Sequence, residues 1–134
     1  ANRKSNNLSC VLRIEAGGRR MLLTSDIEAR DEAALLQRDP EKLAAEVLLM
    51  PHHGSRTSST PAFIAAVGAQ DVVTPVGYRN RFGHPKADVV ERYEASKAKI
   101  WRTDRDGALT VQLDAAGVSV ASWRQERARY WQGR

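Results

Sequence analysis

The sequence has little cysteine, few histidines and no long apolar run. Cys10 is the only cysteine among 134 residues, which excludes an internal disulfide and a zinc site built from several cysteines. Its segment alternates between apolar and polar residues, so we expect a buried structural thiol. No apolar run approaches the roughly eighteen residues that a membrane span needs, and the polar opening ANRKSNNLS is not a signal segment.

The sequence is rich enough in hydrophobic and basic residues for one folded, positively charged domain. Hydrophobic residues make up 42%, and the formal net charge is +5. A basic chain favours anionic partners such as nucleic acid, phosphate or an anionic membrane surface. The excess is greatest in residues 124–134, which we interpret as a basic tail. A solubilising role is the simpler explanation for such a tail, and base stacking by its aromatic residues is the alternative.

Hydrophobic periodicity predicts strands that alternate with helices, and hairpins near both ends. The Gly17-Gly18 pair predicts one hairpin turn, and residues 115–117 predict the other. Expected strands cover residues 9–16, 19–25, 46–50, 71–76, 99–103, 108–114 and 118–124; expected helices cover 26–39, 61–68 and 86–98, with a short turn of helix at 41–45. This order indicates a mixed α/β arrangement in which helices pack on a sheet.

All three histidines of the chain follow expected strands. Asp26 follows one strand, His52 and His53 follow the next, and His84 follows the third. Polar residues in such loops gather at one edge of an α/β sheet, where sites are usually found. One carboxylate and two or three imidazoles are a partial ligand set for a borderline cation such as zinc or manganese.

Each of these residues also has a simpler explanation. Asp26 alone is most simply the N-cap of the following helix, and His84 before a proline is most simply a turn residue. The adjacent pair His52-His53 is harder to explain in this way, because neighbouring side chains after a strand point to different sides. Taken together, the four residues favour a site.

Three polar residues beside the histidines are candidate substrate contacts. The Ser55 hydroxyl belongs to a loop that can contact phosphate, although hydroxyl-rich loops usually serve as caps and turns. Asn80 and Arg81 lie close to His84 in sequence, and an exposed turn is the commoner explanation for them. The segment 102–107, with its two aspartates and its glycine, is interpreted as a structural turn.

Several strings in this order resemble one known family. The strings LLTSDIE, LLMPHHGSRTSS, NRFGHP and RTDRDGA are similar to the carboxy-terminal half of the metallo-β-lactamase fold. They are most similar to the β-lactamase-like domain of ComEC-type DNA-internalisation competence proteins, from about Asn6 to about Val111. The resemblance implies half of an αββα sandwich, with residues 1–123 as the half domain and 124–134 as the tail.

The resemblance also implies roles for individual residues. It gives Asp26, His52 and His84 as metal ligands, and Asp26, His52 and His53 as catalytic residues. Which of His52 and His53 is the ligand stays open, with His52 as the first choice. Ser25 departs from the family, which usually has a glycine before the aspartate; this departure affects only the local turn.

The function implied by the resemblance is metal-dependent hydrolysis of phosphodiesters during DNA uptake. One or two zinc or manganese ions would supply the nucleophile, and the basic surface would bind single-stranded DNA. The parent protein would be a bacterial inner-membrane protein with this part as a soluble, extracytoplasmic domain. The family's His-x-(His/Asp)-x-Asp-His string is missing, so we expect an inactive fragment of a longer chain. The alternatives are a catalytically dead DNA- or partner-binding module of a membrane transporter, or another hydrolase of this fold.

Overall fold

A computed structural model describes residues 8–127 of the chain. Within these residues the main elements, in chain order, are β1 (Leu12–Ala16), β2 (Arg19–Leu23), α1 (Ala29–Arg38), β3 (Val47–Leu49), α2 (Pro61–Val67), β4 (Asp71–Thr74), α3 (Ala87–Ala95), β5 (Lys99–Arg102), α4 (Thr103–Asp106), β6 (Leu109–Asp114), β7 (Gly117–Ser122) and α5 (Trp123–Glu126). Short 3₁₀ turns occupy Pro40–Lys42 and Pro51–Gly54. None of the described helices is long and apolar enough to cross a membrane.

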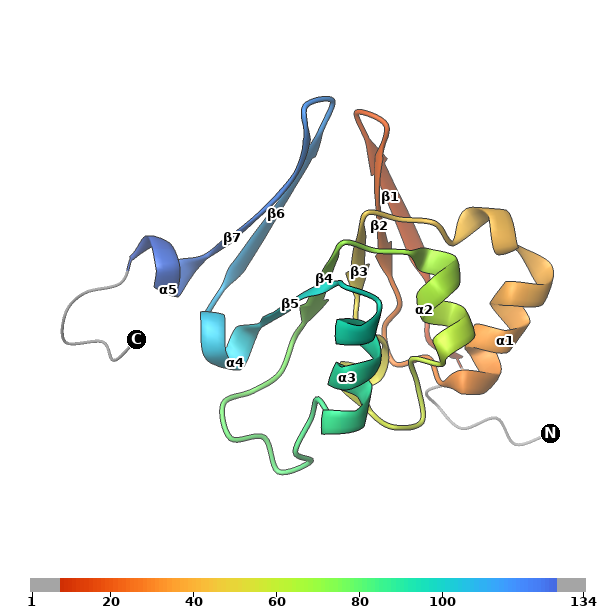
Figure 1. Cartoon of the computed structure of the whole chain (residues 1–134), viewed down its shortest axis with the longest axis horizontal. Coiled ribbons are helices and arrows are strands. Elements are labelled where there is room, and N and C mark those ends of the chain that lie inside the picture. Colours follow the sequence, from red (N-terminus) through yellow and green to blue (C-terminus); the bar gives the residue numbers. More distant parts are fainter. Residues whose placement is uncertain (1–7, 128–134) are drawn as a thin grey trace.

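The sheet is mixed, as the α/β prediction requires. Strands β1 to β5 are neighbours in chain order. Strand β1 pairs antiparallel with β2, whereas β2, β3, β4 and β5 pair in parallel. The hairpin β6–β7 forms a separate two-stranded sheet, which Figure 1 shows extending away from the helices. The carboxyl ends of β2, β3 and β4 therefore meet at one edge.

The core lies between one face of the large sheet and the first three helices. Leu22, Leu48, Val72 and Ile100 are register partners in a single row across β2 to β5. They pack with apolar side chains of α1, α2 and α3, which cover the same side of the sheet in Figure 1. The short strand β3 is buried on both faces, because Val47 and Leu48 are only 0% and 1% exposed, as its continuous apolar run predicts.

Local sequence signals fix the ends of α2. The Thr60 hydroxyl accepts a hydrogen bond from the Phe63 amide at 3.3 Å, and Pro61 takes the first helical position. The helix ends at Gly68, whose φ of 61° is left-handed. The sequence prediction for residues 61–68 is confirmed at both ends.

Two local predictions are wrong. Cys10 is exposed: it precedes β1, an edge strand whose residues are all exposed, so the alternating pattern there does not indicate burial. The expected turn at 104–107 is instead the short helix α4, ended by Gly107. The Asp106 carboxylate stabilises this helix by accepting a hydrogen bond from the Arg102 amide at 2.8 Å. The predicted basic tail lies outside the described residues from position 128 onward.

A candidate site at the carboxyl edge of the sheet

The loops after β2, β3 and β4 are joined by backbone hydrogen bonds at the carboxyl edge of the sheet. The His52 amide donates to the Ser25 carbonyl at 2.9 Å, which joins the first loop to the second. The Lys86 amide donates to the Gly54 carbonyl at 3.0 Å, which joins the second loop to the third. Asp26, the two adjacent histidines and His84 are therefore brought to one edge by the backbone itself.

Asp26 and His53 form the first side-chain pair at this edge. The His53 Nε2 atom lies 3.3 Å from Asp26 Oδ1, and His53 Nδ1 lies 2.7 Å from the Pro75 carbonyl oxygen. A carbonyl oxygen only accepts hydrogen bonds, so Nδ1 carries the proton. In the neutral ring Nε2 is then an unprotonated lone-pair donor facing the same space as the Asp26 carboxylate. Both side chains are about half exposed.

His52 and His84 form the second pair. Their ring centroids are 6.2 Å apart, and the rings meet edge to face. His52 Nδ1 also lies 3.4 Å from the Thr57 hydroxyl. On its other side, His84 stacks with Phe82 at 5.8 Å. Burial lowers the pKa of His84 below its ordinary value, and the nearby positive charge of Lys86 and the other two histidines lowers it further.

The backbone of the second loop is held in an uncommon conformation. His52 and His53 both have left-handed φ values, of 50° and 54°. Consecutive non-glycine residues in this region are disfavoured, and such strain persists where the surroundings enforce it, often at functional sites. The bonds to Ser25 and Pro75 described above hold the two histidines in place.

The side chains that converge here do not by themselves complete a metal centre. Within residues 8–127 there is no group of three or more histidine, cysteine or acidic side chains arranged to hold a metal ion. Imidazole and carboxylate are suitable ligands for zinc and manganese, and the contacts described above join Asp26 to His53 and His52 to His84. The described residues therefore include the right kinds of ligand for such a site, but too few of them lie together to hold a metal ion.

Asp26 is not the N-cap of α1, so its simpler explanation does not hold. The N-cap is Glu28, which forms a capping box with Asp31. Asp26 precedes this cap and faces His53 instead. His84 itself lies in irregular backbone before Pro85, after the turn at residues 81–82.

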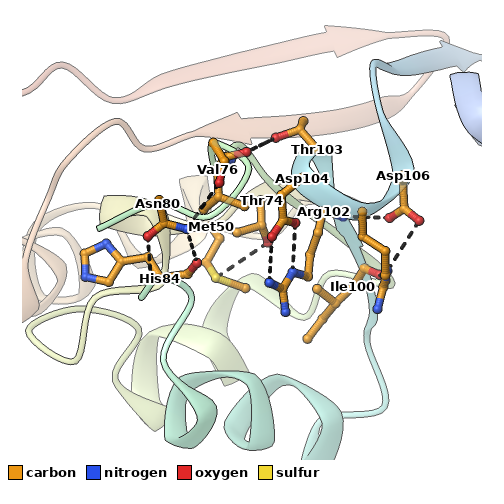
Figure 2. Close-up of polar contacts among 12 residues, drawn as sticks. Met50, Thr74, Val76, Asn80, His84, Ile100, Arg102, Thr103, Asp104 and Asp106 are labelled. Atoms are coloured by element: carbon orange, nitrogen blue, oxygen red, sulfur yellow. Dashed lines mark hydrogen bonds and ion pairs between the residues drawn. The ribbon is translucent and has the colours of Figure 1, made fainter. Parts of the chain in front are cut away.

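The three predicted substrate contacts have different surroundings. Ser55 is nearly buried, and its hydroxyl bonds with Thr57 at 3.0 Å. The Asn80 side chain is engaged with the third loop: it accepts from the His84 amide and donates to the His84 carbonyl, both at 2.8 Å. Figure 2 shows this clasp. Arg81 is exposed, with its guanidinium over the Phe82 ring at 4.9 Å. Arg81 is thus the most accessible of the three.

The 102–107 segment, although helical rather than a simple turn, is held by side-chain contacts beside the edge. Arg102 binds Asp104 through two nitrogens, at 3.1 and 2.8 Å, as Figure 2 shows. The hydrogen bonds from Arg102 lower the pKa of Asp104 below its usual value. Thr103 completes the connection by exchanging two 2.8 Å hydrogen bonds with the Val76 backbone. This segment therefore holds the third loop against β5.

A buried carboxylate that the sequence analysis missed holds the hydroxyl-rich loop after the histidines. Glu32 of α1 is 0% exposed and accepts hydrogen bonds from the amides of Ser59 and Thr60, at 2.6 and 2.8 Å. Burial raises its pKa, against the lowering effect of these bonds and of Arg92. The available signal was its position three and four residues before Leu35 and Leu36, on the apolar stripe of the helix.

Comparison with known proteins relates this chain to a segment of competence proteins. Competence protein ComA of Neisseria gonorrhoeae is 39% identical over 131 residues, covering 98% of this chain and 19% of that protein. Uncharacterized protein YcaI of Escherichia coli (strain K12) is 34% identical over 98% of the chain and 17% of that protein. ComE operon protein 3 of Bacillus subtilis (strain 168) is 33% identical over 78% of the chain and 13% of that protein.

These matches support a place for the chain in the competence-protein family, which agrees with the family part of the sequence resemblance. The chain spans less than a fifth of the length of these relatives. No model of a known protein family matches the chain.

Proposed function

We propose that this chain is the DNA-handling part of a bacterial competence protein. In this proposal its carboxyl sheet edge is one half of a metal-dependent centre that hydrolyses phosphodiesters. The fold would be the carboxy-terminal half of a metallo-β-lactamase-like αββα sandwich, with its soluble domain on the extracytoplasmic side of the inner membrane. Support comes from the names of two relatives and from the net charge of +5, which suits a polyanionic substrate.

The observation that carries the proposal is the convergence of Asp26, His52, His53 and His84 from three loops. Ligands for a catalytic metal come from separate segments that a rigid sheet brings to one edge. Asp26 Oδ1 lies 3.3 Å from His53 Nε2, and the ring centroids of His52 and His84 are 6.2 Å apart. Each pair would supply part of the ligand set of the centre. The remaining ligands would lie outside residues 8–127.

The hydrogen bond from His53 to Pro75 supports a metal-binding role for His53. Metal-binding histidines commonly donate their second ring nitrogen to a backbone carbonyl or carboxylate, which fixes the tautomer. His53 does so through Nδ1 at 2.7 Å, and its Nε2 atom faces Asp26. In our proposal Asp26, His53 and His84 bind the metal. His52 either binds the metal as well or orients the phosphodiester.

The test uses the natural full-length protein and four single alanine substitutions, at Asp26, His52, His53 and His84. Metal content is measured after loading with zinc or manganese, and cleavage of a labelled single-stranded DNA oligonucleotide is followed with each metal. Removing the partner that orients a ligand commonly costs about 10- to 100-fold in metal affinity or activity, and removing a ligand should cost at least as much. The matched control is Asp88→Ala on α3. It removes a surface aspartate whose carboxylate pairs with Arg56. Undiminished metal content and cleavage in all four variants would overturn the proposal.

A second function is favoured by the incomplete ligand set among residues 8–127. In this alternative the chain binds DNA or another subunit without catalysis, and the histidine edge contacts phosphate through imidazole hydrogen bonds alone. A full-length protein that binds the oligonucleotide equally well in EDTA and in manganese, and cleaves it with neither zinc nor manganese, would identify this alternative.

A further inference from the structure

The loop between β4 and α3 carries two aromatic side chains that are not part of the core. Tyr78 is 72% exposed and Phe82 is 59% exposed. We call residues 77–83 the aromatic loop; Figure 1 shows this connection extending beyond the end of the sheet. Exposed aromatic side chains grouped with basic residues on one short loop are typical of surfaces that stack nucleic-acid bases.

Each ring of the aromatic loop is paired with an arginine. The Arg79 guanidinium lies 5.3 Å from the Tyr78 ring centroid, and that of Arg81 lies 4.9 Å from the Phe82 centroid. The segment from Gly77 to Lys86 contains three basic residues and no acidic residue. Alternating rings and guanidinium groups, without carboxylates, are suited to a ligand that has both flat rings and negative charges.

The loop is ordered by its own hydrogen bonds. The Asn80 amide donates to the Gly77 carbonyl at 3.2 Å, and the Gly83 amide donates to the Asn80 carbonyl at 3.1 Å. The Lys86 ammonium donates to the Phe82 carbonyl, and the Asn80 side chain clasps the His84 backbone. The two rings are therefore presented on a constrained scaffold, which lowers the entropic cost of binding.

The aromatic loop leads directly to the histidine edge. Phe82 stacks on His84 with centroids 5.8 Å apart and planes at 24°, and His84 meets His52 at 6.2 Å. A base stacked on the Tyr78 ring would place its phosphodiester backbone along the two arginines, toward the histidines. Bases in a duplex are already stacked on one another, so the loop suits single strands.

We propose that Tyr78 and Phe82 form a base-stacking platform for single-stranded nucleic acid, with Arg79 and Arg81 holding its phosphates. That the bound strand runs toward the histidines rests on the proposed function above. The binding step itself needs neither metal nor hydrolysis.

The test measures binding of the full 134-residue chain to a fluorescent oligothymidylate by anisotropy, in EDTA. Tyr78→Ala and Phe82→Ala should each weaken binding by about 5- to 150-fold, the range expected for loss of one stacked base. Phe82→Trp, which keeps a flat ring, should bind at least as well as the wild-type chain. An abasic oligonucleotide of the same length should bind the wild-type chain at least as weakly as the oligothymidylate binds either alanine variant, because it can stack on neither ring.

The matched control is Trp123→Ala on α5. Trp123 is 52% exposed and has Arg127 over its ring at 5.0 Å, so it reproduces the aromatic–arginine pair elsewhere on the chain. Arg79→Ala and Arg81→Ala should instead lower the salt dependence of binding, each by about one unit of slope or less.

Three results would overturn the proposal. These are unchanged affinity in both alanine variants, an equal loss in Trp123→Ala, or equal wild-type affinity for the abasic strand. Loss of binding to anionic phospholipid vesicles in Tyr78→Ala, with oligonucleotide binding intact, would assign the loop to a membrane surface instead. Base-dependent binding together with absent cleavage in the full-length protein would sustain the platform and remove only the hydrolase proposal.

Discussion

Gly54 lies so close to Pro85 that a Cβ atom on the glycine would be 2.4 Å from the proline Cβ. This contact joins the loop that carries His52 and His53 to the loop that carries His84. Gly54 also has a left-handed φ of 86°, so two independent requirements favour glycine here. The approach of His52 to His84 therefore depends on the absence of a side chain at position 54.

Gly54→Ala should destabilise the chain and separate the two histidine loops. The added methyl group must displace the Pro85 backbone, which lies 2.7 Å from the ideal Cβ position. Overpacking of this kind costs about 1–3 kcal/mol. Urea denaturation measures the loss of stability, and nuclear Overhauser contacts between the His52 and His84 rings report their separation.

Gly18→Ala is the matched control for this substitution. Gly18 has a comparable φ of 77°, but nothing lies within 4 Å of its ideal Cβ position. In both variants the alanine is strained by the left-handed backbone. Only in Gly54→Ala does the added methyl group also collide with Pro85. Equal destabilisation in the two variants would show that the contact with Pro85 contributes nothing.

His84 should titrate below its ordinary pKa, and Lys86→Met should raise that pKa. Burial disfavours the imidazolium, and the positive charge of Lys86 disfavours it further. Because the folded-state pKa lies below the unfolded value of 6.5, the stabilising contribution is complete above pH 6.5. It is lost as the pH falls through the folded-state pKa. NMR titration of the His84 ring protons measures the shift.

Lys42→Met provides the control for the charge effect. It removes a lysine that pairs with Asp39, in the segment between α1 and β3 rather than in the third loop. A His84 pKa that rises equally in both variants would indicate a general effect of net charge. A His84 pKa unchanged by Lys86→Met would remove the lysine charge as a cause and leave burial and the other two histidines.

Cys10 should react with a thiol reagent in the folded chain. It is exposed and is the only cysteine, so the Ellman reagent should modify one thiol per chain without denaturant. The rate should rise little in urea, because folding does not cover the sulfur. Cys10→Ser supplies the blank, and a thiol that reacts only after denaturation would contradict this placement.

The alternation of strands and helices was predictable from sequence, because central strands such as Val47–Leu49 are short continuous apolar runs and the helices between them carry apolar stripes. The loop positions of Asp26 and the histidines followed from the same strand assignments, since the carboxyl ends of parallel strands share an edge. Both parts depend on local periodicity, which the sequence shows directly.

The pairing of side chains within the site was not predictable in this way. The hydrogen bonds from His53 to Pro75 and between Asn80 and the His84 backbone depend on loop geometry. Hydrophobic periodicity gives no information about loop geometry. Cys10 was misplaced because alternation reports burial only where another layer covers the strand, and β1 is an exposed edge. Glu32 was missed because only its position on the apolar stripe of α1 distinguished it from a surface carboxylate.

Glu32→Gln should destabilise the chain, by an amount that depends on pH. The carboxylate accepts from two amides, of Ser59 and Thr60, whereas a carboxamide offers one oxygen and turns an N–H toward the other donor. Leaving one buried amide unsatisfied costs about 1–3 kcal/mol, measured by urea denaturation at neutral pH. Glu91→Gln, on the exposed surface of α3, should change stability by less than about 0.5 kcal/mol.

The pH dependence of this loss follows from the raised pKa of Glu32. Burial raises the folded-state pKa above the unfolded value of 4.5, so the folded chain binds more protons between these two values. The wild-type carboxyl therefore contributes increasing stability as the pH falls from neutral toward 4.5, and the glutamine does not titrate. The difference in unfolding free energy between wild type and Glu32→Gln should widen over that interval. A difference that stays constant would mean that the buried carboxyl has an ordinary pKa, and one that narrows would mean that the two amide hydrogen bonds outweigh its desolvation.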